Sequence, residues 1–188
     1  MIITHHFPVD LPCYFQLGRA NNFPVIESCP ICKSQQKLKR HGFYNRYAIE
    51  TDAEYRIPIC RYKCPNPKCN KTFAILPDFL LPYFQNTLSS ILQTLQLFWA
   101  YCVLLFSRQL VCFYRKRLMA KSKIIEMFFR LEGNKQIFPE DPIEKAIMLL
   151  NMIETLPRVT FIRKWHNHYI SSFMAHSFYH GSPVAKTE

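Results

Sequence analysis

Glycine is scarce in this chain, with four among 188 residues. Proteins that cradle nucleotide phosphates in a glycine-rich loop need several glycines close together, because glycine lets the backbone approach the phosphates and adopt positive φ angles. None of the usual nucleotide-binding motifs occurs in the sequence. We therefore expect no small-molecule substrate of this kind.

Signals for secretion and membrane insertion are also missing. The N-terminal residues MIITHHFPVDLPCYF have neither the basic start nor the continuous apolar run of a secretory signal. No charged residue occurs from Phe79 to Ser107, which is long enough to span a bilayer, but the first half of this segment is rich in Gln, Ser and Thr. The remaining apolar run, LFWAYCVLLF, has ten residues and is too short to cross. We expect a cytoplasmic protein, with membrane association as an alternative.

Proline is absent between Tyr83 and Phe138, whereas nine of the thirteen prolines lie in residues 8–82. Because proline disrupts helix interiors and central strands, the first part should contain loops and short strands, and the second part helices. Strand-like runs occur in QKLKRHGFYNRYAIE, AEYRIPICRYKC and KTFAI. The sequence thus predicts an α+β fold with a small N-terminal β region followed by a mainly helical domain.

Positive charge is concentrated in two blocks. The net charge is +11, with ten Lys or Arg against four acids in residues 24–75, and six against none in residues 107–123. Residues 130–188 are nearly balanced, at seven against six. Such blocks favour a polyanionic partner, although a solvated basic surface without a partner is the alternative.

Two close pairs of cysteines stand out among the eight. Cys29 and Cys32 lie in CPIC, and Cys64 and Cys69 in CPNPKC, with strand-like sequence between the pairs. Four thiolates from two turns are the ligand set of a zinc ribbon with one structural Zn²⁺. Free buried cysteines, a disulfide and a redox motif are the alternatives. Cys60 can replace one ligand, but its position favours the core; three other cysteines read as ordinary residues, namely Cys13, Cys102 and Cys112.

The segments CPIC, HGFYNRY and RIPICRYKCPNPKCNKTFAILPDFLLPY resemble the zinc-ribbon segment at the head of many bacterial insertion-sequence transposases, and a family of short uncharacterised bacterial proteins related to them. The similarity covers residues 25–125. It implies that the ribbon and the adjacent helices bind duplex DNA at element ends, with other proteins of the same element as possible partners. Two features depart from the pattern: Lys33 stands where a glycine often occurs, and the second pair has two extra residues between its cysteines.

The expected organisation follows from these signals. An extended leader covers residues 1–23, the zinc ribbon residues 24–82, the helical domain residues 83–180 and a loose tail residues 181–188. Within the helical domain we expect a helix-turn-helix-like pair at 87–131 and C-terminal helices at 142–179. The pair comprises a helix from Thr87 to Phe106 and a second from Ser107, its N-cap, to Leu131; the third helix starts at DPIE, where Asp141 is the cap and Pro142 suits the first turn.

The segment FSRQLVCFYRKRLMAKSK predicts a basic recognition helix. Arg108 and Gln109 in its first turn are the candidates for reading base edges. Candidates for phosphate contact on this helix are Arg115, Lys116, Arg117, Lys121 and Lys123. Cations also alternate with aromatics in the ribbon, which suits duplex or single-stranded nucleic acid; these further candidates are Lys37, Lys39, Arg40, Arg46, Arg61, Lys63 and Lys71.

Catalytic residues are not evident. The acids after residue 124 lie in helical or capping contexts, and no strand-borne group of acids suited to two-metal phosphoryl transfer is found. The histidines His166, His168, His176 and His180 favour a histidine-rich helix over a second metal site or an HNH-type nuclease. We expect a non-catalytic, zinc-dependent DNA-binding protein that acts as an accessory factor, a regulator or a catalytically deficient transposase remnant. The alternatives are an RNA- or RNA-polymerase-associated zinc ribbon, and a protein-interaction or membrane-associated helical module.

Overall fold

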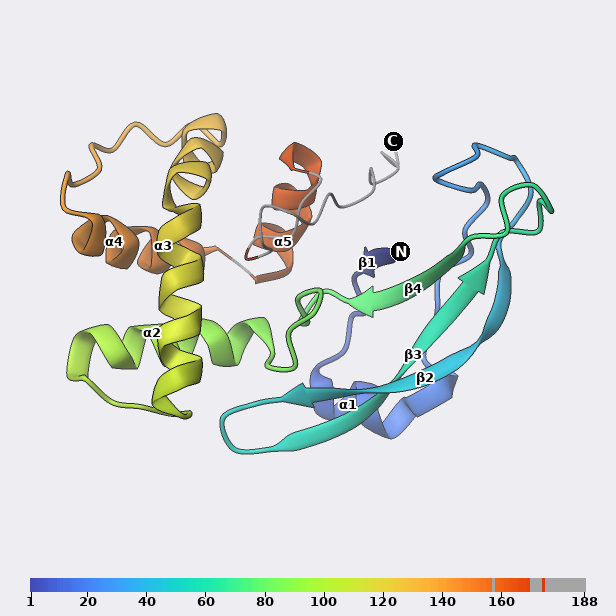
Figure 1. Cartoon of the computed structure of the whole chain (residues 1–188), viewed down its shortest axis with the longest axis horizontal. Helices are drawn as coiled ribbons and strands as arrows, with labels where there is room; N and C mark the ends of the chain where they lie inside the picture. The colour runs from blue at the N-terminus through green and yellow to red at the C-terminus, as the bar shows by residue number, and fades with distance from the viewer. Residues whose placement is uncertain (157, 170–173, 175–188) are drawn as a thin grey trace. The chain divides into compact units, whose positions relative to one another are not determined.

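The computed structural model describes residues 1–156, 158–169 and 174 (Figure 1). The chain forms two compact units, a strand-rich one over Met1–Thr87 and a helical one that begins at Leu88. The sequence predicts a boundary between residues 82 and 83. The expectation of an α+β fold with strands first and helices second is confirmed.

A four-stranded sheet organises the first unit, with strand order β1-β4-β3-β2. The neighbours β2–β3 and β3–β4 are antiparallel, whereas β1 runs parallel to β4. Two of the expected strand-like runs contain β2 and β3, and the third, KTFAI, covers the first four residues of β4, which continues to Pro77. Their bounds are β1 Ile2–His5, β2 Lys39–Ile49, β3 Glu54–Lys63 and β4 Thr72–Pro77.

The middle of β3 is buried on both faces, which explains why IPIC at residues 57–60 is a continuous apolar run. On one side the Tyr14 hydroxyl donates to the carbonyl of Pro58 at 3.0 Å. On the other side Arg46, the register partner of Ile57, donates through its guanidinium to the carbonyls of Leu81 and Phe84. Arg46 therefore ties residues 81–84 to β2, the neighbour of β3.

Residues 1–23 form part of this core and are not an extended leader, which corrects the sequence-based expectation. After β1 come α1, Leu11–Leu17, and a 3₁₀ turn, Gly18–Ala20. Asp10 caps α1 by accepting from the backbone N–H of Cys13 at 2.9 Å, and Gly18 ends it with a φ of 54°. Phe7 and Tyr14 are buried in the core. Burial of these aromatics stabilises an ordered arrangement that an extended leader lacks.

The described part of the second unit contains four helices, and the helix starts at Ser107 and Asp141 agree with the sequence. Ser107 caps α3, accepting from the Leu110 N–H at 3.4 Å, and Asp141 caps α4, accepting from the N–H groups of Ile143 and Glu144 at 2.9 and 2.8 Å. The helices are α2 Leu88–Tyr101, α3 Arg108–Leu131, α4 Pro142–Thr155 and α5 Arg158–His168. Of the C-terminal helices expected at 142–179, the last is present from Arg158 to His168, and Tyr169 lies beyond its end. Residues 170–173 and 175–179 lie outside the described residues.

The end of α2 differs from the expectation, since the helix stops at Tyr101 instead of Phe106. Cys102 adopts a left-handed conformation with a φ of 55°, and its N–H donates to the carbonyl of Phe98 at 3.0 Å. This geometry terminates an α-helix because it turns the chain away from the helix axis. The connection between α2 and α3 is therefore a loop of residues 102–107.

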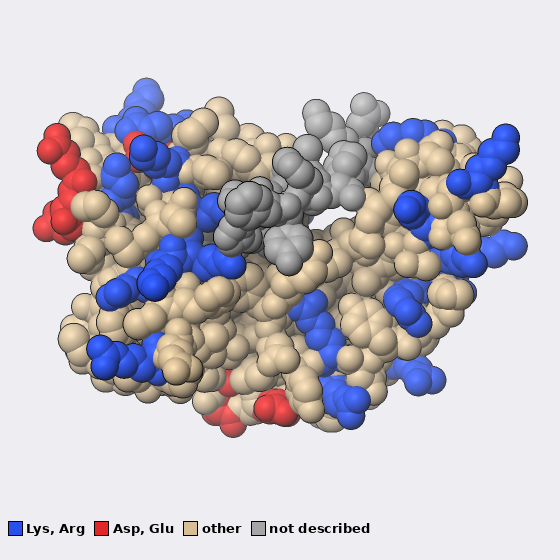
Figure 2. Space-filling view, viewed as in Figure 1, with Lys and Arg blue, Asp and Glu red and all other residues tan. Residues whose placement is uncertain are grey.

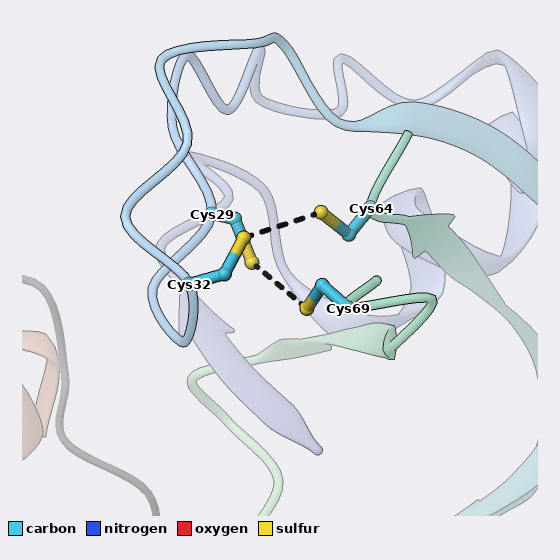
Figure 3. Close-up of side chains that lie close together, drawn as sticks. All are labelled: Cys29, Cys32, Cys64 and Cys69. Carbon is cyan, nitrogen blue, oxygen red and sulfur yellow. Dashed lines mark hydrogen bonds between the residues drawn. The ribbon is translucent and has the colours of Figure 1, made fainter. Parts of the chain in front are cut away.

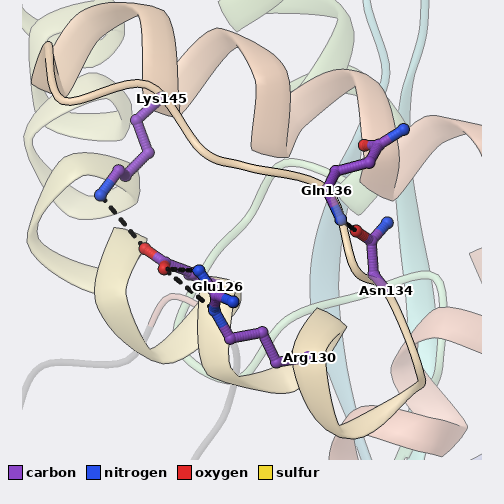
Figure 4. Close-up of polar contacts among 5 residues, drawn as sticks. All are labelled: Glu126, Arg130, Asn134, Gln136 and Lys145. Atoms are coloured by element: carbon purple, nitrogen blue, oxygen red, sulfur yellow. Dashed lines mark hydrogen bonds and ion pairs between the residues drawn. The ribbon is translucent and has the colours of Figure 1, made fainter.

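Aromatic packing and ion pairs hold the helical unit together. Phe128 packs against Phe161 and Trp165, with ring centroids 5.4 and 5.5 Å apart. Glu126 accepts from Arg130 at 2.9 Å and from Lys145 of α4 at 3.1 Å, so one carboxylate links α3 to α4 (Figure 4). Hydrogen bonding from Arg130 lowers the pKa of Glu126. Among the residues that the structure describes, no helix combines the length and the apolar character needed to cross a lipid bilayer.

Candidate metal centre and basic surfaces

Four cysteine sulfurs converge at one end of the first unit's sheet (Figure 3). The Sγ atoms of Cys29, Cys32, Cys64 and Cys69 all lie within 4.8 Å of one another. The Sγ–Sγ distance is 3.8 Å between Cys29 and Cys69, and 3.7 Å between Cys32 and Cys64. Disulfide bonds are about 2.05 Å long, so these are free thiols. The four candidate ligands predicted from the sequence are thus brought together.

The spacing of the sulfurs fits a tetrahedral ion. Zinc–thiolate bonds are about 2.3 Å long, so the edges of a regular tetrahedron of sulfurs are about 3.8 Å. The Cys29–Cys69 and Cys32–Cys64 Sγ–Sγ distances, 3.8 and 3.7 Å, match this edge. The side chains present can therefore hold one metal ion without a change in fold.

The two cysteine-bearing turns have the same backbone design. We call residues 29–34 the first knuckle and residues 64–71 the second knuckle. In the first, the Cys29 N–H donates to the Ser34 carbonyl at 3.0 Å; in the second, the Cys64 N–H donates to the Lys71 carbonyl at 2.9 Å. The residue after each second cysteine has a positive φ, 58° at Lys33 and 49° at Asn70. Each turn thereby directs two sulfurs toward one point.

Asn66 explains how the second knuckle accommodates its longer spacing. Its carbonyl accepts from the N–H groups of Cys69 and Asn70, both at 3.0 Å, which reproduces the turn that the Cys29 carbonyl makes with the Lys33 N–H at 2.9 Å. In the first knuckle, Cys29 lies three residues before Cys32. In the second, the residue three before Cys69 is Asn66, and the first cysteine, Cys64, lies two residues earlier, directly after β3. The Asn66 side chain remains at the cluster, because its Nδ2 donates to the Cys32 Sγ at 3.7 Å.

The environment makes the four thiols unequal. A hydrogen bond from the Ser34 backbone lowers the pKa of Cys32 to about 7, whereas burial raises the pKa of Cys64 to about 12. A backbone hydrogen bond from Lys71 lowers the pKa of Cys69, but burial and the thiols of Cys32 and Cys29 outweigh it, so the net shift is upward. An ion bound here must displace the proton of a buried thiol, and metal binding to such sites releases protons.

The remaining cysteines lie away from the cluster. Cys60 is fully buried in the core of the first unit, as its position in a strand predicts, and it does not replace a ligand. Cys13 and Cys102 are exposed, and Cys112 is partly buried. Burial raises the pKa of Cys60, which fits a thiol in an apolar core.

Lys33 is the position where a glycine is expected to stabilise the protein. A non-glycine residue at a φ of 58° experiences a steric penalty that glycine avoids. We expect Lys33→Gly to raise the free energy of unfolding of the metal-loaded protein by about 0.5–1 kcal/mol. Denaturant titration measures this. Gln36→Gly, in the same loop at a residue without positive φ, serves as the control and should be neutral or destabilising. A loss of stability in Lys33→Gly would contradict the proposed origin of the strain.

Asn66 was not singled out from the sequence, although its position three residues before Cys69 mimics a C-x-x-C spacing. We expect Asn66→Asp to weaken metal binding about 10-fold or more, because groups that hydrogen-bond to a metal ligand typically contribute that much. The aspartate keeps an acceptor for the Lys68 N–H, which Asn66 binds at 3.0 Å, but replaces the donor to Cys32 with a negative charge. Competition with a chelator and the sulfur-to-Co²⁺ charge-transfer band measure the effect. Equal affinity with an unchanged band would show that the hydrogen bond to Cys32 does not matter.

The predicted ribbon cations occupy different environments. Arg40, Arg61 and Lys71 are exposed, as is Lys39, whereas Lys63 is partly buried. Arg61 stacks on the exposed ring of Tyr44, with 5.9 Å from its guanidinium carbon to the ring centroid. Two of the candidates have partners within the chain: Lys37 pairs with Glu27 at 3.1 Å, and Arg46 clamps the backbone at Leu81 and Phe84. Arg46 therefore has a structural contact that the sequence did not indicate.

The predicted contacts on α3 range from fully exposed positions to positions beside its buried residues. Val111, Tyr114 and Leu118 are buried, as the helical spacing predicts. Arg108, Gln109, Lys116 and Lys123 are exposed, and the remaining three candidates, Arg115, Arg117 and Lys121, are partly exposed. Two of these cations stack on rings of their own unit: Arg115 lies 5.6 Å from the Phe98 centroid and Arg117 lies 5.0 Å from that of Phe113.

The histidines of α5 have roles within the helical unit. His168 Nε2 lies 2.9 Å from a carboxylate oxygen of Glu132, which also accepts from Lys164. Burial lowers the pKa of His166. Over the described part of the chain, the cysteine cluster is the one group of three or more candidate metal ligands. His176 and His180 lie outside the described residues.

A family match covers part of the chain. Residues 29–97 match a family described as Domain of unknown function (DUF6431). The matched region begins at Cys29 and contains all four clustered cysteines, strands β2 to β4 and most of α2. No curated protein and no solved structure matches the chain. The similarity is therefore to a family without an assigned function, over less than half of the sequence and centred on the four-cysteine sheet.

Proposed function

We propose that this protein is a zinc-dependent DNA-binding protein related to the zinc-ribbon heads of insertion-sequence transposases. The observation that carries the proposal is the cluster of four free thiols at tetrahedral spacing, at the end of a strongly basic sheet. Zinc is proposed because it favours four thiolates in tetrahedral geometry and has no redox chemistry. In this role the ion is structural: it fixes the two knuckles and, with them, the cations of the strands that lead into them.

The charge distribution supports a nucleic-acid partner. Residues 28–49 and 55–77, which include the clustered cysteines, contain no Asp or Glu. Figure 2 shows Lys and Arg gathered over the knuckle end of the first unit, and acidic side chains gathered elsewhere. When cations without neighbouring carboxylates contact DNA phosphates, counterions are released from the DNA. The free energy of this release dominates non-specific binding to DNA.

The second part of the proposal concerns α2 and α3. We propose that they act as a helix-turn-helix-like pair in which Arg108 and Gln109 read bases and the later cations of α3 contact phosphates. A serine N-cap at Ser107 leaves the first turn of α3 exposed, and no acid occurs before Glu126 on this helix. In this arrangement the first turn of a recognition helix contacts base edges.

Electrophoretic mobility shift with the zinc-loaded protein tests the proposal. We expect binding to duplex DNA whose affinity falls steeply between about 50 and 200 mM salt. The role is proposed as non-catalytic, so supercoiled plasmid should remain intact with Mg²⁺ or Mn²⁺. An absence of duplex binding at low salt would reject the DNA-binding role, and nicking would reject the non-catalytic one.

One feature favours a second candidate, binding of single-stranded RNA. Tyr44 is 36% exposed on β2 and lies beside Arg61, and Tyr47 of the same strand is 42% exposed. An exposed ring beside a guanidinium suits stacking on an unpaired base. Single-stranded RNA is therefore the second probe in the mobility-shift assay, and tighter binding to it than to duplex DNA would favour this candidate.

A further inference from the structure

A hollow with a volume of about 350 Å³ lies beside the metal centre in the first unit. One side comes from the strand ends of β2 and β3, and the other from the second knuckle. Its wall carries two lysines, an arginine and a histidine from the strands, together with knuckle residues; the lining is Lys39, Arg40, His41, Lys63, Cys64, Pro65, Asn66, Pro67 and Asn70.

The sheet register holds like charges together at this hollow. Lys39 and Lys63 are direct partners across β2 and β3, so both side chains emerge on the same face of the sheet. Like charges directly opposite each other destabilise a strand pair. Among the described residues neither lysine forms an ion pair with a carboxylate, and neither does Arg40, whose guanidinium lies 5.6 Å from the Phe23 ring centroid. The hollow thus collects positive charge without a counter-charge from the protein.

Two anions can balance this charge: the tetrathiolate centre itself, or a group from outside. The contacts of the sulfurs favour the second. The sulfurs receive hydrogen bonds from backbone groups, such as those of Ser34 and Lys71, and from the Asn66 side chain, and they contact one another. Among the described residues no lysine or arginine side chain is seen to donate to them. The cations line an open depression instead, where an incoming anion can reach them.

We infer that this hollow binds a phosphodiester group of the nucleic-acid backbone, with Lys39 and Lys63 as its ligands. The inference rests on the proposed function and adds a specific anchor to it. Because Cys64 and Asn66 line the same depression, a metal ion held by the cysteine cluster would fix one wall of this anchor. The second knuckle then serves two purposes: it holds the ion and forms one wall of the phosphate site.

The experiment compares two variants of the zinc-loaded full-length protein. Lys39→Gln/Lys63→Gln removes both charges at the hollow. The control, Arg56→Gln, removes an exposed cation of β3 outside the hollow. Affinity for duplex DNA is measured by fluorescence anisotropy over a range of salt concentrations. Zinc content and the melting curve of each variant are recorded, because the comparison requires a loaded metal centre.

We expect the double variant to bind at least about 10-fold more weakly, and the slope of log K against log[salt] to become shallower by about 0.9, since one phosphate contact is lost. Arg56→Gln should leave the slope unchanged. A wild-type slope in the double variant would overturn the hollow as a phosphate site and leave DNA binding intact. No binding by the wild-type protein would reject the proposed function itself. Loss of zinc from the double variant would show that the lysines balance the metal centre, and would also overturn the inference.

Discussion

Replacing Cys64 with serine, or removing the metal with a chelator, is expected to unfold the knuckle end of the first unit and to lower its melting temperature by about 20 °C. The loops that carry the cysteines contribute little apolar burial: Ile31 is 41% exposed and Val25 is 69% exposed. On the proposed function, the conformation of these loops depends on an ion shared by the four cysteines. Structural zinc contributes folding free energy directly, so a loss of several kcal/mol is expected.

The helices from Leu88 onward should stay folded in the same experiment, because their core of Tyr114, Phe128 and Trp165 is independent of the cysteine cluster. Metal analysis, thermal unfolding and hydrogen exchange resolved by residue measure these effects. Cys13→Ser is the matched control, since Cys13 is exposed and lies outside the cluster. A metal-free wild-type protein that melts like the metal-loaded one, and whose knuckle amides exchange as slowly as in the loaded protein, would refute a structural ion.

Two pairs of variants on α3 are expected to separate base reading from phosphate contact. Arg108→Ala/Gln109→Ala should relax the sequence preference by about 1–3 kcal/mol at each base pair that these side chains read. Lys116→Gln/Lys121→Gln should weaken binding to all duplexes alike and make the salt slope shallower by about 1.8, because only phosphate contacts are removed. The physical reason is that base edges differ between sequences, whereas the backbone charge does not.

Selection from a randomised duplex library, first with the wild-type protein and then with each variant, measures the change in preference. Lys135→Gln is the control, because Lys135 is an exposed cation beyond the end of α3. The recognition-helix assignment fails if both pairs bind every duplex as the wild type does. If the Lys116→Gln/Lys121→Gln pair alone changes the preferred sequence, the roles of the two groups on the helix must be exchanged.

Features that depend on neighbours in the chain could be predicted from the sequence. Ser107 and Asp141 cap their helices as expected, because a cap is a hydrogen bond to an amide two or three residues away. The alternation of aromatic and charged residues located β2 and β3, and the cysteine spacing identified the four thiols of the cluster. DNA binding, by contrast, stays a prediction here. The predicted end of α2 was wrong, because the helix stops where Cys102 adopts a left-handed conformation. That conformation usually requires a glycine, and the sequence has none at this position.

Features that depend on distant parts of the chain were decided by tertiary structure alone. No local pattern in the sequence indicates that the aromatic residues near the N-terminus complete a core with β3. Nor does any local pattern indicate that β1 pairs with β4. In the sequence, Arg46 cannot be distinguished from the other basic residues of an exposed strand. In the structure, its guanidinium donates to the carbonyls of Leu81 and Phe84. Local hydrogen bonds and side-chain periodicity depend only on residues that are close together in the sequence. The surroundings of a side chain, by contrast, are determined by the tertiary contacts between segments that are far apart in the sequence. These contacts decide whether a cation such as Lys63 lies against solvent, a carboxylate or an open hollow.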